Sequence, residues 1–193
     1  SDQLAVGLLK SGLTRDDIII TQLYTCVEIY LLIVACQKAG IILATVTPNF
    51  REASIEPVLR HVKAKAAVIP WKFREHDFFR MYTEMKPQVP SLQQIIVIGD
   101  EIPSGAISFK DLSGTPVANE DREILHRNGI LPWELSRVGT TSGSTGLPKL
   151  YEVIESSRVS TVRNIIDRWE IKESDIVGAF YPITGGGLEK IAL

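Results

Sequence analysis

One stretch of the chain consists of residues suited to holding a ligand rather than to building a core. From Gly139 to Gly146 every residue is Gly, Ser or Thr, and Leu147, Pro148 and Lys149 follow. Glycines allow successive backbone N–H groups to turn inward around an oxyanion, and the hydroxyl side chains add further donors. Pro148 stiffens the exit, and Lys149 places one positive charge there. Such a loop suits a polyphosphate, whose charge is spread over many oxygens.

Two other interpretations compete with a phosphate-binding loop. Gly/Ser-rich segments also serve as flexible linkers, but linkers rarely place a lysine directly after a Gly-x-Pro end and directly before a helix. A Walker A loop requires G-x-x-x-x-G-K-[ST]. Here Gly146 is followed by Leu147, and Lys149 by Leu150, so that pattern is absent. The sequence therefore disfavours both a linker and a P-loop kinase or NTPase.

The first hundred residues alternate between helical and strand patterns. Helices are expected over residues 3–12, 26–40, 54–62 and 73–85, and strands over 16–23, 41–47, 66–70 and 93–100. This alternation is typical of a parallel sheet with crossover helices. The strands are unbroken apolar runs, which indicates that helices cover both faces of the sheet. The predicted fold class is α/β.

Particular residues set the expected helix ends. Gly12 and Gly40 follow two of the helical patterns, and a left-handed residue there costs little. Ser54 is the expected N-cap of the third helix. Pro57 fits that helix if it begins near Ser54, whereas an earlier start implies a kink.

Three parts of the chain are predicted. Residues 1–100 form an α/β subdomain, and residues 101–137, where periodicity fades, form an irregular connection. Residues 138–193 contain the phosphate-binding loop, a helix and the start of a second, incomplete α/β subdomain. Short helices are expected within 103–112 and 120–130, and a longer helix and a strand within 155–171 and 174–183.

Composition excludes several classes of protein. The chain is 45% hydrophobic and 23% charged with a formal net charge of −2, as expected of a globular protein. It has no basic stripe for nucleic acid and no polybasic tail for a membrane. The most apolar segment, between Cys26 and Cys36, is too short to span a bilayer and contains Glu28. Without metal-ligand spacing, the two cysteines are expected to be buried free thiols, which favours a cytoplasmic location.

The segment "TSGSTGLPK", residues 141–149, resembles the phosphate-binding loop of the adenylate-forming superfamily. This superfamily includes acyl-CoA synthetases, aryl-acid–AMP ligases, luciferases and peptide-synthetase adenylation domains. Nine positions agree, the proline and the lysine among them. Residues 8–50 are also similar to the family's N-terminal run of helix, Gly, strand, long apolar helix and strand. The resemblance covers nearly all of the chain and implies the N-terminal subdomain of that fold.

The resemblance implies a two-step reaction. Family members activate a carboxylic acid with ATP and Mg²⁺, giving an acyl-adenylate and pyrophosphate. They then pass the acyl group to a thiol, that of coenzyme A or of a carrier-bound pantetheine. Lys149 is the implied catalytic residue and contacts the β- and γ-phosphates. The residues implied to cradle these phosphates are Thr141, Ser142, Gly143, Ser144, Thr145 and Gly146.

The sequence departs from the family pattern at two places that bear on the acyl substrate. Many relatives carry "T-H" shortly after the loop, but Glu155 or a neighbour stands where that His would fall. The "P-x-F-H" element is also missing, because Pro182 is followed by Ile183, Thr184 and Gly185. Leu150 is similar to the residue at this position in aryl-acid ligases. The acid itself stays open.

The family's other nucleotide and Mg²⁺ motifs, and its C-terminal domain, are expected beyond Leu193. We therefore expect an N-terminal fragment that is inactive alone and whose partner is the remainder of its own chain. The alternative is a self-contained, non-catalytic module that binds a nucleotide or another anion. The three histidines and three tryptophans carry no expected catalytic role.

Overall fold

The computed structural model describes residues 1–141 and 148–176. Within these residues, strands of one sheet are β1 (Ile18–Thr21), β2 (Ile42–Thr45), β3 (Ala66–Pro70), β6 (Gln94–Ile98), β7 (Ile107–Ser108), β8 (Leu135–Thr140) and β9 (Leu150–Ile154). Their order is β7-β6-β3-β1-β2-β8-β9. Every neighbouring pair is parallel except β8 and β9, which are antiparallel. The predicted α/β class with a parallel sheet is confirmed.

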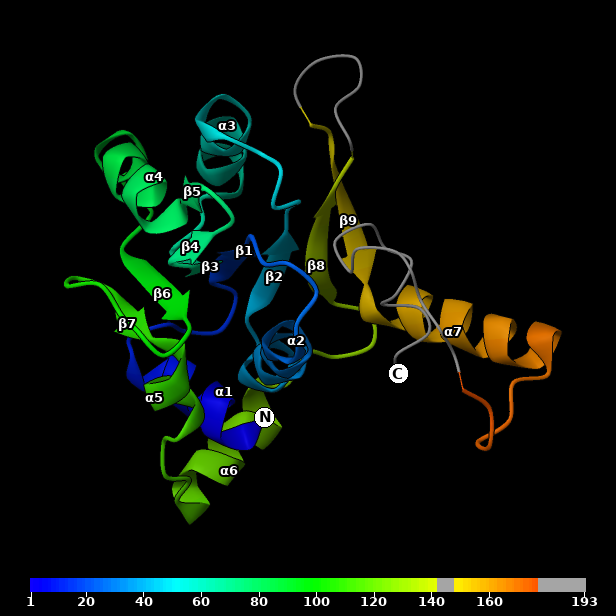
Figure 1. Cartoon of the computed structure of the whole chain (residues 1–193). Coiled ribbons are helices and arrows are strands. Elements are labelled where there is room, and N and C mark those ends of the chain that lie inside the picture. The colour runs from blue at the N-terminus through cyan, green and yellow to red at the C-terminus, as the bar shows by residue number, and fades with distance from the viewer. Residues whose placement is uncertain (142–147, 177–193) are drawn as a thin grey trace.

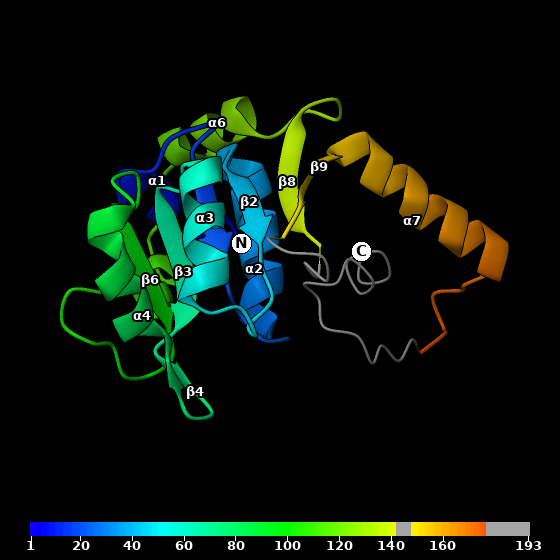
Figure 2. The same cartoon turned by 90° about the horizontal axis from the view of Figure 1, so that it is seen from above.

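Helices cover both faces of this sheet, as expected (Figures 1 and 2). One face carries α1 (Asp2–Lys10), α2 (Val27–Ala39), α5 (Phe109–Ser113) and α6 (Asn119–Asn128). The opposite face carries α3 (Glu52–Val62) and α4 (Phe78–Met85), which is followed by a 3₁₀ turn, η1 (Lys86–Gln88). The last described helix is α7 (Glu155–Trp169).

Alternating strand residues build a separate core on each face. In β1, Ile19 packs into the core under α1 and α2, whereas Ile20 packs into the core under α3 and α4. Their partners in β2, Leu43 and Ala44, divide in the same way. Successive side chains of a strand point to opposite faces, so an unbroken apolar run is what a sheet covered on both sides requires.

Two predicted helix ends are confirmed and one predicted start is wrong. Gly12 and Gly40 have φ values of +101° and +75°, in the left-handed region that glycine tolerates. α3 begins at Glu52 with Arg51 as its N-cap. The Arg51 carbonyl already accepts the N–H of Ser54 at 2.8 Å, so Ser54 lies inside the first turn rather than at the cap.

The predicted helix over residues 73–85 is right only from Phe78 onward. Before it, β4 (Lys72–Phe73) and β5 (His76–Asp77) pair as a short antiparallel hairpin. Arg74 turns this hairpin with a φ of +56°. The carboxylate of Asp77 then caps α4 by accepting the Arg80 N–H at 2.9 Å. A side-chain cap of this kind fixes where a helix begins.

Residues 101–137 contain α5 and α6, which overlap the two short helices expected there, and also the short strand β7. α5 lies so close to α1 that a Cβ added at Gly7 would be 2.4 Å from the Leu112 carbonyl oxygen. β8 then joins the same sheet beside β2. The division of the chain at residues 101 and 138 stays a prediction.

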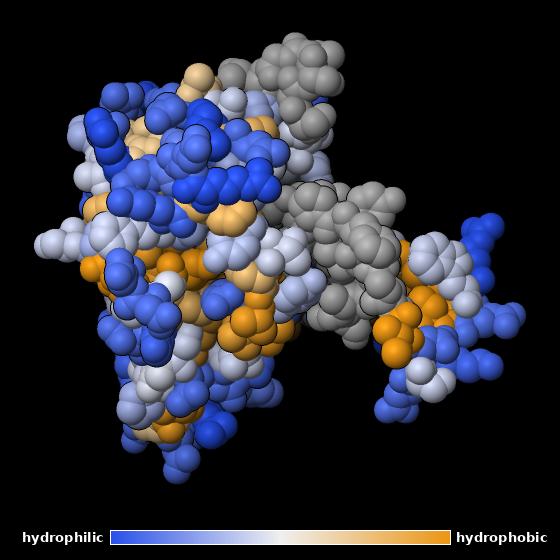
Figure 3. Space-filling view, in the orientation of Figure 1, coloured by the Kyte–Doolittle hydropathy of each residue, from blue (hydrophilic) through white to orange (hydrophobic). Residues whose placement is uncertain are grey.

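The final described segment carries exposed apolar side chains. α7 confirms the predicted helix after the loop. Figure 3 shows hydrophobic surface on this helix, where Val159, Ile166 and Trp169 are 38%, 39% and 63% exposed. The strand expected over 174–183 falls almost entirely outside the described residues. No helix in the described part of the chain is long and apolar enough to cross a membrane.

Candidate functional site

The predicted phosphate-binding loop connects the two strands of an antiparallel hairpin. β8 and β9 pair as far as Thr140 and Leu150 (Figure 1). Just beyond, the N–H of Thr141 donates to the Lys149 carbonyl at 2.9 Å. The N–H of Lys149 in turn donates to Oγ1 of Thr141 at 3.0 Å. Two hydrogen bonds therefore hold the ends of the loop together.

The structure places two of the predicted site residues and not the others. Thr141 and Lys149 are both exposed at the mouth of the hairpin. The residues outside the described part of the chain are Ser142, Gly143, Ser144, Thr145 and Gly146. No sequence pattern indicated that Oγ1 of Thr141 accepts a backbone N–H. That contact leaves the hydroxyl hydrogen of Thr141 available to a ligand, because a hydroxyl can accept and donate at once.

The hairpin mouth is fixed at the carboxyl edge of the parallel strands. β8 runs parallel to β2, with Thr45 opposite Gly139. The hydroxyl of Thr140 donates to the Thr45 carbonyl at 3.3 Å, where β2 ends. Ligands of open α/β sheets bind outside the carboxyl ends of the strands. The loop is thus held at the edge where a ligand is expected.

A cavity of about 480 Å³ adjoins the exit of the loop. Its lining comes from α3 and from the start of β9: Pro57, Val58, His61, Pro148, Lys149 and Leu150. The polar side chains of this lining are those of His61 and Lys149. The sequence predicted no role for His61. No local pattern connects this histidine with Lys149, which lies almost ninety residues later in the chain.

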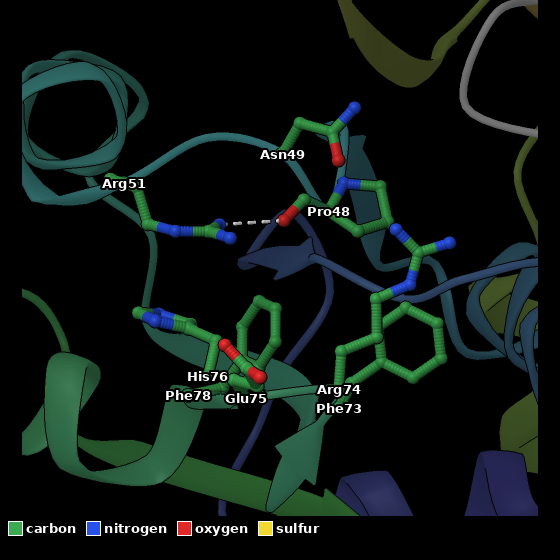
Figure 4. Close-up of a pocket in the computed structure, with 8 residues that line it drawn as sticks. All are labelled: Pro48, Asn49, Arg51, Phe73, Arg74, Glu75, His76 and Phe78. Atoms are coloured by element: carbon green, nitrogen blue, oxygen red, sulfur yellow. Dashed lines mark hydrogen bonds between the residues drawn. The ribbon is translucent and has the colours of Figure 1, made fainter.

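A second cavity, of about 520 Å³, lies at the same edge of the sheet (Figure 4). One wall is the turn after β2, and the other is the β4–β5 hairpin with the first residue of α4. The lining residues are Pro48, Asn49, Arg51, Phe73, Arg74, Glu75, His76 and Phe78. Sequence reasoning missed this cavity, because its two walls are separate segments without a shared motif.

Cations and aromatic rings alternate around the second cavity. The guanidinium of Arg51 lies 5.8 Å from the centre of the Phe78 ring, and that of Arg74 lies 5.4 Å from the Phe73 ring. Arg51 also donates to the Pro48 carbonyl at 2.9 Å (Figure 4). Burial, followed by the charge of Arg51, lowers the pKa of His76 below its ordinary value of 6.5. The arginines therefore supply the positive charge here at neutral pH.

The described residues offer no metal centre and no disulfide. No three His, Cys, Asp or Glu side chains gather closely enough to hold a metal ion in residues 1–141 and 148–176. Cys26 and Cys36 are free thiols; Cys36 is buried, as expected, whereas Cys26 is only partly buried. Burial raises the pKa of Cys26 to about 11, so this thiol is not a ready nucleophile.

Comparison with known proteins assigns the chain to a family. A profile described as AMP-binding enzyme matches residues 1–184. The chain belongs to the AMP-binding enzyme family. This match confirms the family resemblance that the segment "TSGSTGLPK" indicated.

Three curated relatives of this chain are ligases. It is 26% identical to the 2-hydroxy-7-methoxy-5-methyl-1-naphthoate–CoA ligase of Streptomyces carzinostaticus, over 78% of this chain and 27% of that protein. It is 27% identical to the acyl-CoA ligase SID4 of Ajellomyces capsulatus, over 92% and 31%. It is 22% identical to the 2,3-dihydroxybenzoate-AMP ligase of Bacillus subtilis (strain 168), over 95% and 32%. The chain spans about a third of the length of these relatives.

Solved structures share the fold of this chain. The acetoacetyl-CoA synthetase from Streptomyces lividans superposes with a TM-score of 0.77 at 19% identity, over 95% of this chain and 29% of that one. The anthranilate CoA ligase AuaEII, solved with anthranoyl-AMP, superposes with a TM-score of 0.70 at 19% identity, over 84% and 29%. At these identities the likeness supports the fold alone.

Proposed function

We propose that this chain is the N-terminal part of an AMP-forming acid–thiol ligase. The enzyme activates a carboxylic acid with ATP to an acyl-adenylate and pyrophosphate, and then transfers the acyl group to a thiol such as that of coenzyme A. The observation that carries the proposal is the closed hairpin mouth at Thr141 and Lys149. It holds a Gly/Ser/Thr loop at the carboxyl edge of the sheet in a chain of the AMP-binding enzyme family.

In the first step, the loop stabilises charge on the leaving group. ATP, when bound, supplies the adenylyl group that the carboxylate attacks. We assign the ammonium group of Lys149 and the donors of residues 141–146 to the β- and γ-phosphates, where negative charge grows as pyrophosphate leaves. Donors fixed in advance at such a position are among the largest contributors to catalysis. Mg²⁺ would accompany the phosphates, with its protein ligands outside the described residues.

The cavity between the turn after β2 and the β4–β5 hairpin fits the nucleotide part of coenzyme A. Arg51 and Arg74 present guanidinium groups that suit phosphate. Phe73 and Phe78 present aromatic surface at the same cavity, which suits stacking of a base. We therefore assign the thiol cofactor to this cavity, at the same sheet edge as the phosphate loop.

The remainder of the ligase is the expected partner of this chain. Val159, Ile166 and Trp169 leave an apolar face of α7 uncovered by described residues, which supports a second α/β subdomain that begins near residue 138 and continues past Leu193. The isolated 193-residue chain is accordingly expected to be inactive. Two free cysteines favour a cytoplasmic enzyme.

An aryl acid is the alternative to an aliphatic one, since relatives named for naphthoate and dihydroxybenzoate stand beside an acyl-CoA ligase. A non-catalytic module that binds only a nucleotide is the second candidate function. Pyrophosphate release by the natural full-length protein, screened over aliphatic, aryl and amino acids, separates these candidates. The ligase releases pyrophosphate with at least one class of acid, whereas the module releases none.

The cofactor assignment has its own test. Arg74→Ala should raise the KM for coenzyme A about tenfold, since a charge-assisted contact with phosphate is lost. The control Arg80→Ala removes an exposed arginine of α4 that is paired with Glu84 outside the cavity. Equal KM values for the two variants would place coenzyme A elsewhere.

A further inference from the structure

Gln22 is a buried polar residue that joins the two walls of the second cavity. It lies directly after β1 and is 0% exposed. Its Nε2 donates to the Thr47 carbonyl at 3.0 Å and to the Phe50 carbonyl at 2.9 Å. Its Oε1 accepts the hydroxyl of Tyr82 at 3.1 Å. Both amide hydrogens and the amide oxygen of Gln22 are therefore engaged.

These partners belong to opposite sides of the cavity. Thr47 and Phe50 bracket the turn that carries Pro48 and Asn49 on the first wall. Tyr82 lies on α4, whose first residue, Phe78, is on the second wall. One amide thus fixes the turn against the helix. Arg51 makes a second link, because it donates to the Pro48 and Phe50 carbonyls and its guanidinium lies 5.8 Å from the centre of the Phe78 ring.

Gln22 is a buried polar residue with buried apolar neighbours in the sequence. Ile20 and Leu23, close to it in sequence, are both fully buried. Tyr82 is also fully buried, and burial raises the pKa of its hydroxyl far above the ordinary value, so it stays a neutral donor. An apolar side chain at position 22 would leave two carbonyls and this hydroxyl without their partner, which is costly inside a protein. A polar residue at position 22 is therefore explained by its hydrogen bonds to the turn and to Tyr82.

We propose that Gln22, together with Tyr82, is a positioning residue that sets the spacing of the cavity walls for the nucleotide part of the thiol cofactor. The inference rests on the proposed function, which places coenzyme A in this cavity. Its geometric consequence is the placement of Arg51. That residue follows the clamped turn directly and reaches across to Phe78 on the other wall.

The test uses the natural full-length protein and adenosine 3′,5′-bisphosphate, which carries the base, the ribose, the 3′-phosphate and the first 5′-phosphate of coenzyme A. Gln22→Leu should raise the Kd of this probe, measured by calorimetry, about tenfold, since three hydrogen bonds are lost. Tyr82→Phe, which removes one bond and keeps the ring, should raise it about threefold. Acid-dependent exchange of pyrophosphate into ATP should stay within about twofold of wild type, because that half-reaction does not use the thiol. Thr83→Ala, an exposed neighbour on α4, is the matched control.

Two results would overturn the positioning role. In the first, Gln22→Leu and Tyr82→Phe bind the probe as wild type does while Arg74→Ala binds it weakly, so that the cavity holds the nucleotide without help from Gln22. In the second, pyrophosphate exchange falls in parallel with probe binding, as a general loss of structure predicts. If Gln22→Leu does not fold, Tyr82→Phe alone carries the test. Failure of the proposed ligase function is separate, since wild type would then show no exchange with any acid.

Discussion

Thr141 and Lys149 hydrogen-bond to each other at the two ends of the predicted phosphate-binding loop. Each uses its backbone N–H to reach the other, at 2.9 Å to the Lys149 carbonyl and at 3.0 Å to Oγ1 of Thr141. The carbonyl contact is available to any residue, whereas the second contact needs a side-chain acceptor at position 141. The two contacts fix the backbone of Lys149 opposite Thr141 at the ends of the loop.

Thr141→Val should lower ATP-dependent pyrophosphate exchange clearly and the free energy of unfolding only slightly. The change keeps the shape of the side chain but removes the acceptor for the Lys149 N–H. We expect pyrophosphate exchange at low ATP to fall about fivefold, with a loss of about 1 kcal/mol or less in the free energy of unfolding. Thr141→Ser keeps the acceptor and should restore exchange. A Thr141→Val variant as active as wild type would show that the contact is dispensable.

Lys149→Ala should slow adenylation more than thiol transfer. The proposed contacts of the ammonium group are with phosphates that leave in the first step, and removal of such a donor costs on the order of a hundredfold in rate. Single-turnover kinetics of the two half-reactions provide the measurement. Lys172→Ala, at an exposed lysine after α7, is the control. Equal slowing of both steps would contradict the assigned role.

Gly40→Ala should destabilise the protein more than Gly105→Ala. Both glycines have positive φ, +75° and +89°, so each substitution carries a left-handed strain of about 1 kcal/mol. At Gly40 the new Cβ would also lie 2.4 Å from the Asn128 carbonyl oxygen, whereas at Gly105 nothing lies within 4 Å. Urea unfolding should show a cost at Gly40 at least about twice that at Gly105. Similar losses of unfolding free energy in the two variants would show that the backbone at Asn128 moves away from the new Cβ at little cost.

Asp17→Asn should remove part of the stability at neutral pH but not at low pH. Burial raises the pKa of Asp17, but hydrogen bonds from Lys65 and from Thr14 outweigh this and hold the pKa below its ordinary value of 3.8. A carboxylate with a lowered pKa contributes stability above its unfolded pKa, and this is lost as pH falls through the folded pKa. We expect a difference of about 1 kcal/mol between wild type and variant at pH 7. Urea titrations should show that it shrinks below pH 4, and a difference that is constant down to pH 3 would contradict the ion pair's role.

Local sequence was enough to predict the elements that have an unambiguous hydrophobic pattern. The strand Ala66–Pro70 coincides with its prediction, because an unbroken run of apolar residues is the pattern expected of a strand that is buried on both faces of a sheet. Residues 73–85 were misassigned at their start. The structure at the start of this segment depends on the pairing of β4 with β5 and on the Asp77 cap. Hydrophobic periodicity carries no information about either contact.

The candidate site divides in the same way. The loop from Thr141 to Lys149 is one contiguous motif, so its residue types and order were enough to predict a phosphate-binding role. The second cavity and its clamp are not contiguous. Gln22 meets Tyr82 only because β1 and α4 are brought together by the fold, and a single glutamine in an apolar run carries no signal of that contact.

The central claim is that the hairpin loop grips the triphosphate of ATP during activation of an acid. Acid-dependent exchange of labelled pyrophosphate into ATP by the natural full-length protein tests it most directly, with wild type and Lys149→Ala compared side by side. The account predicts exchange by wild type with at least one aliphatic, aryl or amino acid and a rate on the order of a hundredfold lower in the variant. Exchange with none of these acids, or equal rates in the two proteins, would contradict it.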